Sequence, residues 1–364
     1  MKGIKLKVII CSTSFHETDR RLMRIVDALI EENYKVEWMS RSNLDSQKAG
    51  SKITHTILKT LFKRGPLFYL EYNFRLFLKL LSRKQSIVCA VDLDTAPGVC
   101  WARRVKRHII TYDAHEIFYE VPELTDKPIK KYIWKSVARN YLPKIKYNYT
   151  VNQSLAGHYS AHYKTDYTVI RNIPPKQKTG LSSKKFTKTL VYLGVLNEGR
   201  GVELAIECMR RKQDYQLLLM GEGDLSDQLR EQADGLSNVT FLGQVPPEEV
   251  HEKLQQADIG LNILIASSLN YKLSLANKFF DYLQAGLPSI NMDYPEYNNI
   301  LDRHQVGIAI QEYSVDHLSN AIDFLSDSEL YTKLKNNCLQ FRELYDWNIE
   351  KEKLIQLYST IISG

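Results

Sequence analysis

The sequence VYLGVLNEGRGVELAIE (Val191–Glu207) reads as a buried strand that ends at Gly194, then a loop containing Gly199-Arg200-Gly201, then a helix. Short apolar runs of this kind are typical of strands that are buried on both faces of a parallel sheet. Glycines in the loop let the backbone approach a ligand, and the fork of Arg200 can grip a diphosphate. An ordinary strand–turn–helix with a surface arginine has the same pattern, so this stretch alone leaves both interpretations open.

The same alternation of strand-like runs and helical stretches extends through the whole chain. Strands are predicted in the second half at Thr189–Gly194, Tyr215–Gly221, Asn238–Gly243 and Asp258–Leu264, and in the first half at Leu6–Cys11, Lys35–Ser40, Ser86–Val91, His108–Asp113 and Tyr147–Asn152. Strands separated by helices form parallel sheets, and ligands bind such sheets at the carboxyl ends of the strands. The chain is therefore predicted to be an α/β protein with two doubly wound, Rossmann-like domains that face a cleft.

The boundary between the two domains is marked by composition. The segment IPPKQKTGLSSKK (Ile173–Lys185) is rich in Pro, Gly, Ser and Lys, as linkers are. We predict an N-terminal domain at residues 1–171, a linker at 172–188 and a C-terminal domain at 189–345. Residues 346–364 are predicted to form a helix that packs back on the first domain.

Composition and charge limit the class of protein. Apolar content of 44% and charged content of 25% are those of a folded soluble protein. Five scattered cysteines without a CxxC pattern indicate reduced thiols and no metal site. No apolar run suits a signal peptide or a membrane span. We therefore expect a cytoplasmic protein. Residues 1–171 hold 30 Lys and Arg against 16 Asp and Glu, a formal charge of +14, and the remainder carries −7. By charge alone, the partner of the basic half is either a nucleic acid or the anionic inner face of the cell membrane.

One segment concentrates the basic charge. Lys59–Lys84 has seven basic residues, one acidic residue, and leucines and aromatic residues throughout. This composition fits a helix that lies in a membrane interface. It fits equally well a helix that faces the protein core and keeps its lysines in solvent, and the sequence does not separate these alternatives.

A second stretch in the C-terminal half carries candidate chemistry. In LNYKLSLANKFFDYLQAGLPSI (Leu269–Ile290), Lys278 and Asp281 are three residues apart near the start of a predicted helix. Free backbone N–H groups and the positive end of the helix dipole would help the lysine to hold a phosphate, and the carboxylate could take a sugar hydroxyl. The alternative is an exposed ion pair worth a few tenths of a kcal/mol.

Three further loops follow predicted strands. LLLMGEGD (Leu217–Asp224) repeats the strand–glycine–helix pattern. YDAHEIFYEVPEL (Tyr112–Leu124) places His115 and Glu116 just after a strand, where a histidine can transfer protons or position a hydroxyl, or can simply be structural. STSFHETDRRLMR (Ser12–Arg24) predicts a helix capped by Thr18 or Asp19, with basic residues that either meet an anionic ligand or remain solvated.

These segments together resemble the nucleotide-sugar-dependent glycosyltransferases of family 4, which have the two-domain GT-B fold, and within them a bacterial surface-polysaccharide subgroup. The motifs that carry the resemblance run in order from Thr18 to Ile290 and include TDRRLMRIVDAL, VDLDTAPG, YDAHEIFYEVPEL, YTVNQSLAGHY, VIRNIPP, GVLNEGRGVELAIE, GEGD, FLGQVP and LNYKLSLANKFFDYLQAGLPSI.

The resemblance implies roles for particular residues. Arg200 and Lys278 would contact the donor diphosphate as catalytic cations, and His115 and Glu116 match the family's D-x-H-E element. Asp281 would bind the ribose. The rest of the nucleotide site would comprise Gly194, Gly221, Gly223, Gln244, Val245 and Asn277. Asp19 and Arg21 match a D-x-R element on the acceptor side or in the cleft.

The resemblance also implies an activity. The expected reaction transfers a sugar from a UDP-sugar or GDP-sugar to a glycan or a lipid-linked acceptor, with retention of configuration, without a metal or another cofactor, and without nucleic acid as a partner. The chain departs from the family at Leu273, where the first acid of an E-x7-E motif is absent, and at Val195, where an arginine is common. Two alternatives therefore stay open, which are a nucleotide-sugar epimerase and a scaffold or regulatory protein that has lost its chemistry.

Overall fold

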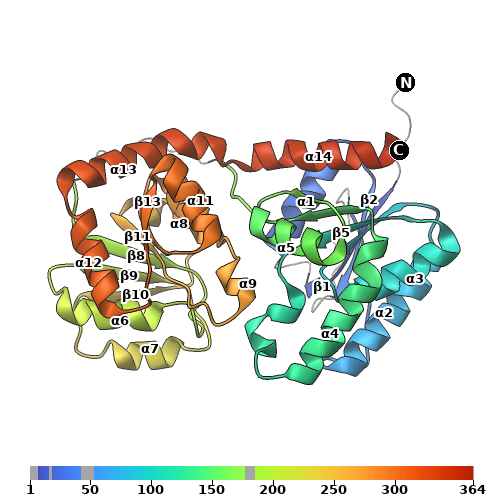
Figure 1. Cartoon of the computed structure of the whole chain (residues 1–364), viewed down its shortest axis with the longest axis horizontal. Coiled ribbons are helices and arrows are strands. Elements are labelled where there is room, and N and C mark those ends of the chain that lie inside the picture. Colours follow the sequence, from blue (N-terminus) through green and yellow to red (C-terminus); the bar gives the residue numbers. More distant parts are fainter. Residues whose placement is uncertain (1–6, 16–18, 42–52, 177–184, 364) are drawn as a thin grey trace. The chain divides into compact units, whose positions relative to one another are not determined.

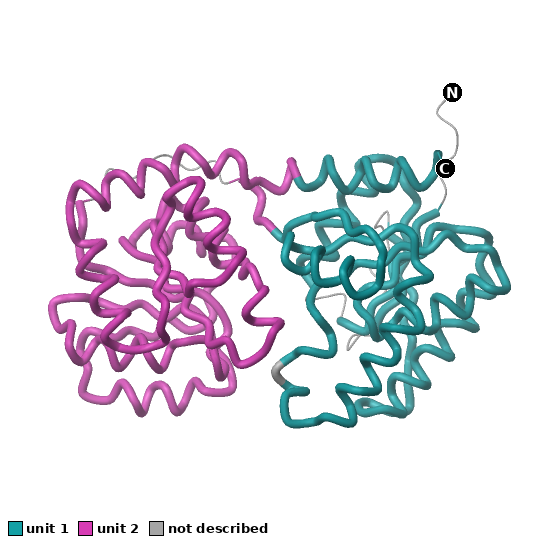
Figure 2. Tube along the Cα trace, viewed as in Figure 1, with its two compact units in different colours: residues 1–172, 350–364 teal, residues 173–349 magenta. Residues whose placement is uncertain are grey.

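The computed structural model describes residues 7–15, 19–41, 53–176 and 185–363 and divides the chain into two compact units (Figure 2). Unit 1 contains residues 1–172 and 350–364, and unit 2 contains residues 173–349. Residues 177–184 of the predicted linker lie outside the described part. Ile173, at the beginning of that linker, is fully buried in the core of unit 2 and so belongs to the domain itself.

Unit 1 is built on a parallel sheet with the strand order β3-β2-β1-β4-β5-β6-β7 (Figure 1). Its strands are β1 (Val8–Phe15), β2 (Val36–Arg41), β3 (Ile53–Ile57), β4 (Ile87–Val91), β5 (Ile109–Ala114), β6 (Tyr147–Thr150) and β7 (Tyr167–Val169). β3 and β7 are the two strands of this sheet that the sequence did not predict. Both lie at sheet edges and are only partly buried, so their sequences lack a continuous apolar run.

The helices of unit 1 connect these parallel strands. They are α1 (Arg20–Glu31), α2 (Pro66–Leu81), α3 (Ala96–Lys106), α4 (Pro128–Tyr141) and α5 (Gln153–Tyr163), and α2 and α3 pack side by side (Figure 1). Short 3-10 turns occupy Phe118–Glu120, Pro122–Leu124 and Leu142–Lys144. Asp19 caps α1 by accepting a hydrogen bond from the backbone N–H of Leu22 at 3.0 Å, whereas the other predicted cap, Thr18, lies outside the described residues.

The last helix, α14 (Trp347–Ser363), begins in unit 2, and its larger part belongs to unit 1. Tyr358 is completely buried, and its ring makes an edge contact with Tyr34 at 6.1 Å between centroids. Lys351 forms an ion pair with Glu31 at the end of α1. The C-terminal segment is thus part of the core of the first domain.

Unit 2 contains a second parallel sheet with the order β10-β9-β8-β11-β12-β13. Its strands are β8 (Thr189–Leu193), β9 (Gln216–Met220), β10 (Val239–Gly243), β11 (Ile259–Asn262), β12 (Ser289–Met292) and β13 (Gly307–Ile310). Successive residues of β8 enter different cores, because Leu190 and Tyr192 join a large apolar cluster and Val191 joins a smaller one. Burial on both faces explains why this strand reads as an unbroken apolar run.

The helices of unit 2 are α6 (Val202–Arg211), α7 (Ser226–Gln232), α8 (Pro247–Gln255), α9 (Leu269–Lys272), α10 (Asn277–Ala285), α11 (Pro295–His304), α12 (Val315–Leu325) and α13 (Ser328–Phe341), with a 3-10 turn at Arg342–Leu344. Across the described part of the chain, no helix combines the length and the apolar character needed to cross a bilayer.

Candidate functional site

In unit 2 the order in which successive strands are added to the sheet changes direction at β8. The chain proceeds from β8 to β9 and β10 on one side, and β11, β12 and β13 lie on the other. The loops that leave the carboxyl ends of β8 and β11 therefore diverge, and such a switch point is where open α/β sheets bind ligands. The predicted residues Gly194, Arg200 and Lys278 all lie on segments that begin at these two strand ends.

The predicted glycines bring neighbouring strand ends into close contact. Gly194 and Gly221 have φ angles of 138° and 141°, and a Cβ atom on Gly221 would lie 1.9 Å from the carbonyl oxygen of Gly194. The N–H of Gly221 donates to the carbonyl of Gly243 at 2.8 Å. A Cβ on Gly223 would lie 2.4 Å from Oδ1 of Asn197. These glycines thus have a packing reason to be glycine, and their contact with a nucleotide stays a prediction.

Lys278 is a buried cation at the start of α10. Its side chain is 8% exposed, and Nζ lies 3.5 Å from the centroid of the Tyr192 ring, which provides a cation–π contact. A Cβ on Gly194 would lie 3.3 Å from this Nζ, so the absence of a side chain there leaves room for the amine. Among the residues that the structure describes, no carboxylate lies within ion-pair distance of Lys278.

The rest of α10 anchors this lysine. One turn after Lys278, the Tyr282 hydroxyl accepts from the N–H of Leu193 at 3.0 Å and donates to the carbonyl of Leu261 at 3.0 Å. Leu193 ends β8 and Leu261 belongs to β11, so Tyr282 joins the two diverging strands. Residues four apart share one face of a helix, and Lys278 is therefore held at the same switch point.

Arg200 lies on the loop between β8 and α6. Its Cζ is 5.2 Å from the centroid of the Tyr271 ring, and its Nε is buried without a hydrogen-bond partner among the described residues. The loop is tied to the segment after β11, because the N–H of Ile265 donates to the carbonyl of Gly199 at 3.0 Å. Gly201, which precedes α6, has φ of 81°, and a Cβ there would lie 2.0 Å from the Ile263 carbonyl oxygen.

The two cations influence each other. Burial, followed by the positive charge of Arg200, lowers the pKa of Lys278 well below its usual value, and the charge of Asp281 only partly opposes this. A bound dianion would relieve both the repulsion and the loss of hydration. The arrangement can therefore hold a diphosphate and stabilise negative charge that develops on it.

The remaining predicted residues of unit 2 surround this site. Asn277 is the first residue of α10 and is exposed, and Asp281 is half-buried on the same helix. Gln244 is exposed and Val245 packs against the smaller apolar cluster, both directly after β10. Their positions at the carboxyl edge of the sheet agree with the predicted site, and their contacts with a nucleotide stay predictions. Tyr192 and Tyr271, which support the two cations, were not predicted, since an aromatic residue in an apolar run gives no sign of its partner.

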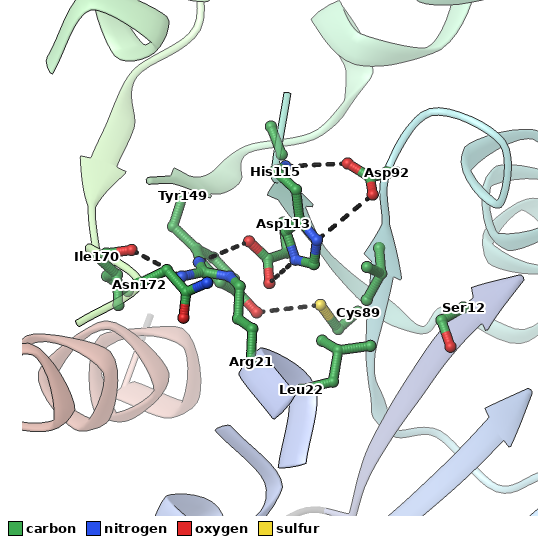
Figure 3. Close-up of polar contacts among 12 residues, drawn as sticks. Ser12, Arg21, Leu22, Cys89, Asp92, Asp113, His115, Tyr149, Ile170 and Asn172 are labelled. Atoms are coloured by element: carbon green, nitrogen blue, oxygen red, sulfur yellow. Dashed lines mark hydrogen bonds and ion pairs between the residues drawn. The ribbon is translucent and has the colours of Figure 1, made fainter. Parts of the chain in front are cut away.

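Unit 1 has its own switch point between β1 and β4, and a row of alternating charges begins there (Figure 3). A guanidinium nitrogen of Arg21 lies 3.0 Å from Oδ1 of Asp113, whose Oδ2 lies 3.0 Å from Nε2 of His115. Nδ1 of His115 lies 3.5 Å from Oδ2 of Asp92, and Oδ1 of Asp92 accepts from the backbone N–H of His115 at 2.9 Å. Both ring nitrogens of His115 thus face carboxylates.

These contacts determine the charges in the row. Burial lowers the pKa of His115, but the negative charges of Asp92 and Asp113 outweigh it and raise the pKa to about 9. Burial raises the pKa of Asp92 to about 6 in spite of the opposing charge of His115. For Asp113, burial acts upward, but the charges of Arg21 and His115 hold the pKa below its usual value. At neutral pH the row therefore alternates between positive and negative groups.

The prediction that Arg21 meets an anionic ligand requires a correction. Arg21 is 5% exposed, and besides Asp113 its guanidinium donates to the carbonyl of Ile170 at 3.1 Å. Its charge is used inside the domain because a buried arginine needs a buried counter-charge. Asp19 caps α1 and also accepts from the Ser14 hydroxyl at 2.9 Å. Glu116 is half-buried, and its backbone carbonyl accepts from the Tyr159 hydroxyl at 2.6 Å.

The sequence analysis quoted three acidic residues at this edge, Asp92, Asp94 and Asp113, only as parts of motifs and gave them no role. Asp94 is 5% exposed, accepts a hydrogen bond from the Thr13 hydroxyl, and has a pKa that burial raises to about 7. The signal was available, because Asp92 and Asp94 follow the apolar run of β4 directly. Within the described ranges, no group of three or more His, Cys, Asp or Glu residues is placed to hold a metal ion.

Comparisons with known proteins concern the fold of the chain and the sequence of unit 2. Residues 175–340 match the family model described as "Glycosyl transferases group 1". The phosphatidyl-myo-inositol mannosyltransferase of Mycobacterium leprae is 26% identical over 192 residues, 49% of this chain and 48% of that protein. The same enzyme from Mycolicibacterium smegmatis is 26% identical over 181 residues, covering 48% of this chain and 45% of that protein. The chain thus matches about half the length of these curated relatives.

Solved structures are similar over almost the whole chain. WaaG, a glycosyltransferase involved in lipopolysaccharide biosynthesis, superposes with a TM-score of 0.71 at 15% identity, covering 98% of this chain and 100% of that chain. Anabaena Alr3699/HepE in complex with UDP and glucose gives a TM-score of 0.75 at 13% identity, covering 97% and 99%. At these identities the likeness concerns the fold. The predicted fold is therefore confirmed: residues 175–340 of unit 2 match the glycosyl transferases group 1 model, and the chain has the GT-B fold of these solved glycosyltransferases.

Proposed function

We propose that the protein is a glycosyltransferase that moves a hexose or related sugar from a UDP-sugar or GDP-sugar to a glycan or lipid-linked acceptor. The observation that carries this proposal is the pair of cations, Arg200 and Lys278, at the switch point of a glycosyl transferases group 1 domain. A diphosphate leaving group would supply the negatively charged partner that neither side chain has within the described structure.

The cations would act mainly by electrostatics. As the bond between sugar and phosphate breaks, negative charge grows on the diphosphate, and Arg200, Lys278 and the first N–H groups of α10 stabilise it. Removing one preorganised donor of this kind costs about 2–4 kcal/mol of barrier, which is two to three decades in rate. We propose that configuration is retained, with the acceptor hydroxyl attacking on the face that the diphosphate leaves.

We also propose that the reaction needs no metal. Arg200, Lys278 and the N-terminus of α10 would supply the positive charge that a divalent ion otherwise provides to neutralise a diphosphate. Nucleotide release that is unchanged by a chelator would support this, and loss of release on chelation would contradict it.

The relatives support a lipid-linked acceptor in the synthesis of a bacterial surface polysaccharide. WaaG is involved in lipopolysaccharide biosynthesis, and the mycobacterial relatives are mannosyltransferases of phosphatidyl-myo-inositol. Such an acceptor would place the protein at the inner face of the cell membrane.

A surface of unit 1 suits such a peripheral position. α2 buries one face through residues such as Phe68 and Tyr72, whereas Leu67, Leu70, Phe74 and Leu78 of its other face are 49–62% exposed. The exposed residues recur at intervals of three and four, so they form one apolar stripe. The core-facing alternative for the segment Lys59–Lys84 therefore describes the buried face of α2, and we propose the membrane-interface alternative for its exposed face.

Further exposed apolar and basic groups lie on α2 and on α4, which contacts it. Tyr69 of α2 contacts Trp134 of α4 at 4.9 Å between ring centroids, and Ile129 and Tyr132 of α4 are 76% and 68% exposed. Arg75 and Lys79 are exposed on α2. Apolar side chains beside cations fit an interface with anionic lipid.

A vesicle assay tests the membrane part of the proposal. The protein should sediment with vesicles that contain phosphatidylglycerol, more strongly at low salt, and Phe74→Ser should weaken sedimentation. Phe324→Ser is the matched control, because Phe324 is 59% exposed on α12 of unit 2. Equal losses in the two variants, or no sedimentation at low salt, would remove the membrane proposal.

A thermal-shift screen against UDP, GDP, ADP, CMP and their common sugars, followed by measurement of nucleotide release, tests the catalytic part. Stabilisation by UDP or GDP together with turnover of the matching sugar supports transfer. Binding without turnover would favour the scaffold alternative. A new nucleotide sugar formed without an acceptor would favour an epimerase.

A further inference from the structure

We propose that Asp92 is the substrate-facing member of the charged row in unit 1, and that its carboxylate binds a hydroxyl group of a sugar. This inference rests on the proposed function, because it names a residue that holds one of the two sugars of the transfer reaction.

The position of Asp92 is the first argument. It follows β4 directly, beside the switch point between β1 and β4, where the sheet of unit 1 is expected to bind ligands (Figure 3). Its side chain is 21% exposed, equal to His115 and unlike the completely buried Asp113. Asp92 and His115 are therefore the two members of the row that a ligand can reach.

The backbone of Asp92 is the second argument. Its φ angle is 56°, in the left-handed region that residues other than glycine rarely adopt. Its N–H donates to the carbonyl of Asp113 at 2.9 Å, which holds the turn in place. Strained backbone persists where the surroundings enforce it, and such positions cluster at ligand-binding sites.

The third argument is the saturation of His115. Nε2 faces Asp113 at 3.0 Å and Nδ1 faces Asp92 at 3.5 Å, so neither ring nitrogen points to a ligand. A protonated imidazole between two carboxylates is also a poor proton acceptor. The proton-transfer role that the sequence suggested for His115 therefore gives way to a positioning role, in which Arg21 and Asp113 hold the ring behind Asp92.

The chemistry of the exposed end determines the ligand class. Asp92 accepts one hydrogen bond, from the backbone N–H of His115, and a carboxylate has capacity for further donors. Its pKa of about 6 leaves it ionised at neutral pH. Two more acidic residues, Asp94 and Glu116, add negative charge at this end of the row. A neutral hydroxyl group can donate into this surrounding, whereas a phosphate would meet like charge.

The hydroxyl could belong to the acceptor or to the sugar part of the donor, and one experiment separates the two sources. The reporter is the NMR signal of the His115 imidazole, assigned with His115→Gln, in the full-length protein. The probes are methyl α-glucopyranoside and methyl α-mannopyranoside as free neutral sugars, glucose 6-phosphate as an anionic sugar, and UDP and GDP with and without their sugars.

The variants are chosen to keep the fold. Asn and Gly both tolerate a positive φ, so Asp92→Asn removes the charge and Asp92→Gly removes the side chain without new backbone strain. Asp126→Asn, at an exposed acidic residue of the same unit, is the matched control.

We expect a neutral sugar to shift the His115 signal. Asp92→Asn should weaken the binding of that sugar roughly tenfold, and Asp126→Asn should leave the sugar affinity unchanged. A shift with free sugars identifies the acceptor as the source, and a shift only with a nucleotide sugar, but not with the nucleotide alone, identifies the donor. The inference is overturned if no neutral or nucleotide-linked sugar moves the signal, if glucose 6-phosphate is preferred, or if both Asp92 variants respond like the unmodified protein. Failure of the proposed function is separate, because it would appear as the absence of nucleotide-induced thermal stabilisation.

Discussion

Replacing Lys278 by methionine should stabilise the ligand-free protein while it weakens nucleotide binding. Methionine preserves the length of the side chain and can pack on the Tyr192 ring, but it removes a charge that is 8% exposed and has no carboxylate partner among the described residues. Desolvating an unpaired charge costs several kcal/mol, and the cation–π contact returns about 0.5–2 kcal/mol of this. We therefore expect the free energy of unfolding to rise by about 1–2 kcal/mol, and the melting temperature by about 2–8 °C for a unit of this size.

The loss of binding should appear in the same melting assay. A ligand at 100 times its dissociation constant stabilises the unmodified protein by about 2.7 kcal/mol. Removing a charge-assisted hydrogen bond worth about 1.5–3 kcal/mol raises the dissociation constant roughly 10- to 100-fold. At the same ligand concentration the stabilisation then falls to about 0.4–1.4 kcal/mol.

The pH dependence gives a second and independent measurement. The pKa of Lys278 is lowered in the folded protein, so below its usual value of 10.5 the unfolded chain binds more protons at this residue than the folded one does. Wild-type stability should therefore gain from Lys278 as the pH rises toward 10.5, and Lys278→Met should lack that gain. Lys272→Met is the control, since Lys272 is exposed in the same segment. If Lys278→Met melts no higher than Lys272→Met and still responds fully to the nucleotide, the reasoning is wrong.

Three further outcomes are expected. Arg200→Gln should lower the rate of nucleotide release by about two to three decades, while Arg210→Gln, at an exposed arginine of α6, should leave that rate unchanged. Folding raises the pKa of His115 from 6.5 to about 9, so its contribution to stability should be complete below pH 6.5 and disappear as the pH rises through 9. Urea denaturation should detect this decline, and His115→Gln should lack it. Gly221→Ala should destabilise unit 2 by about 3 kcal/mol or more in the same denaturation assay, because the new Cβ would lie 1.9 Å from the carbonyl oxygen of Gly194. An unchanged denaturation midpoint would show that the two loops are not packed as described.

Sequence reasoning located the candidate site best where its residues lie in contiguous segments, and their roles stay predictions. Gly194 and Arg200 follow one apolar strand, and Lys278 lies in the first turn of a helix that ends before Gly286. The strand pattern also predicted the class of fold, because strands buried on both faces read as apolar runs. Of the strands that it missed, β3, β7 and β13 lie partly buried at sheet edges, where the apolar signal is interrupted, and β12 is buried but only four residues long.

Contacts between distant segments were beyond reach. Arg21 and Asp113 are separated by 92 positions, and only the parallel register of β1, β4 and β5 brings them together. Without Asp113, the sequence showed a basic helix start that seemed available to an anion. The Tyr192 ring below Lys278 is a comparable case, since its position in the strand explains its burial but does not reveal the cation above it.

The two switch points differ in how their charges are balanced, and the difference suggests how each is used. In unit 1 each charged group of the row has an opposite neighbour, from Arg21 through Asp113 and His115 to Asp92, so the site is compensated without a ligand. In unit 2 burial and then the nearby charge of Arg200 lower the pKa of Lys278, and Asp281 only partly opposes this, so a bound anion would complete the charge balance of the site. A preorganised site of uncompensated charge lowers stability and is the arrangement that stabilises a developing anion best. In the proposed reaction, the uncompensated positive charge of unit 2 therefore lies where the leaving group would form, whereas the edge of unit 1 that we propose to bind a sugar is charge-balanced without a ligand.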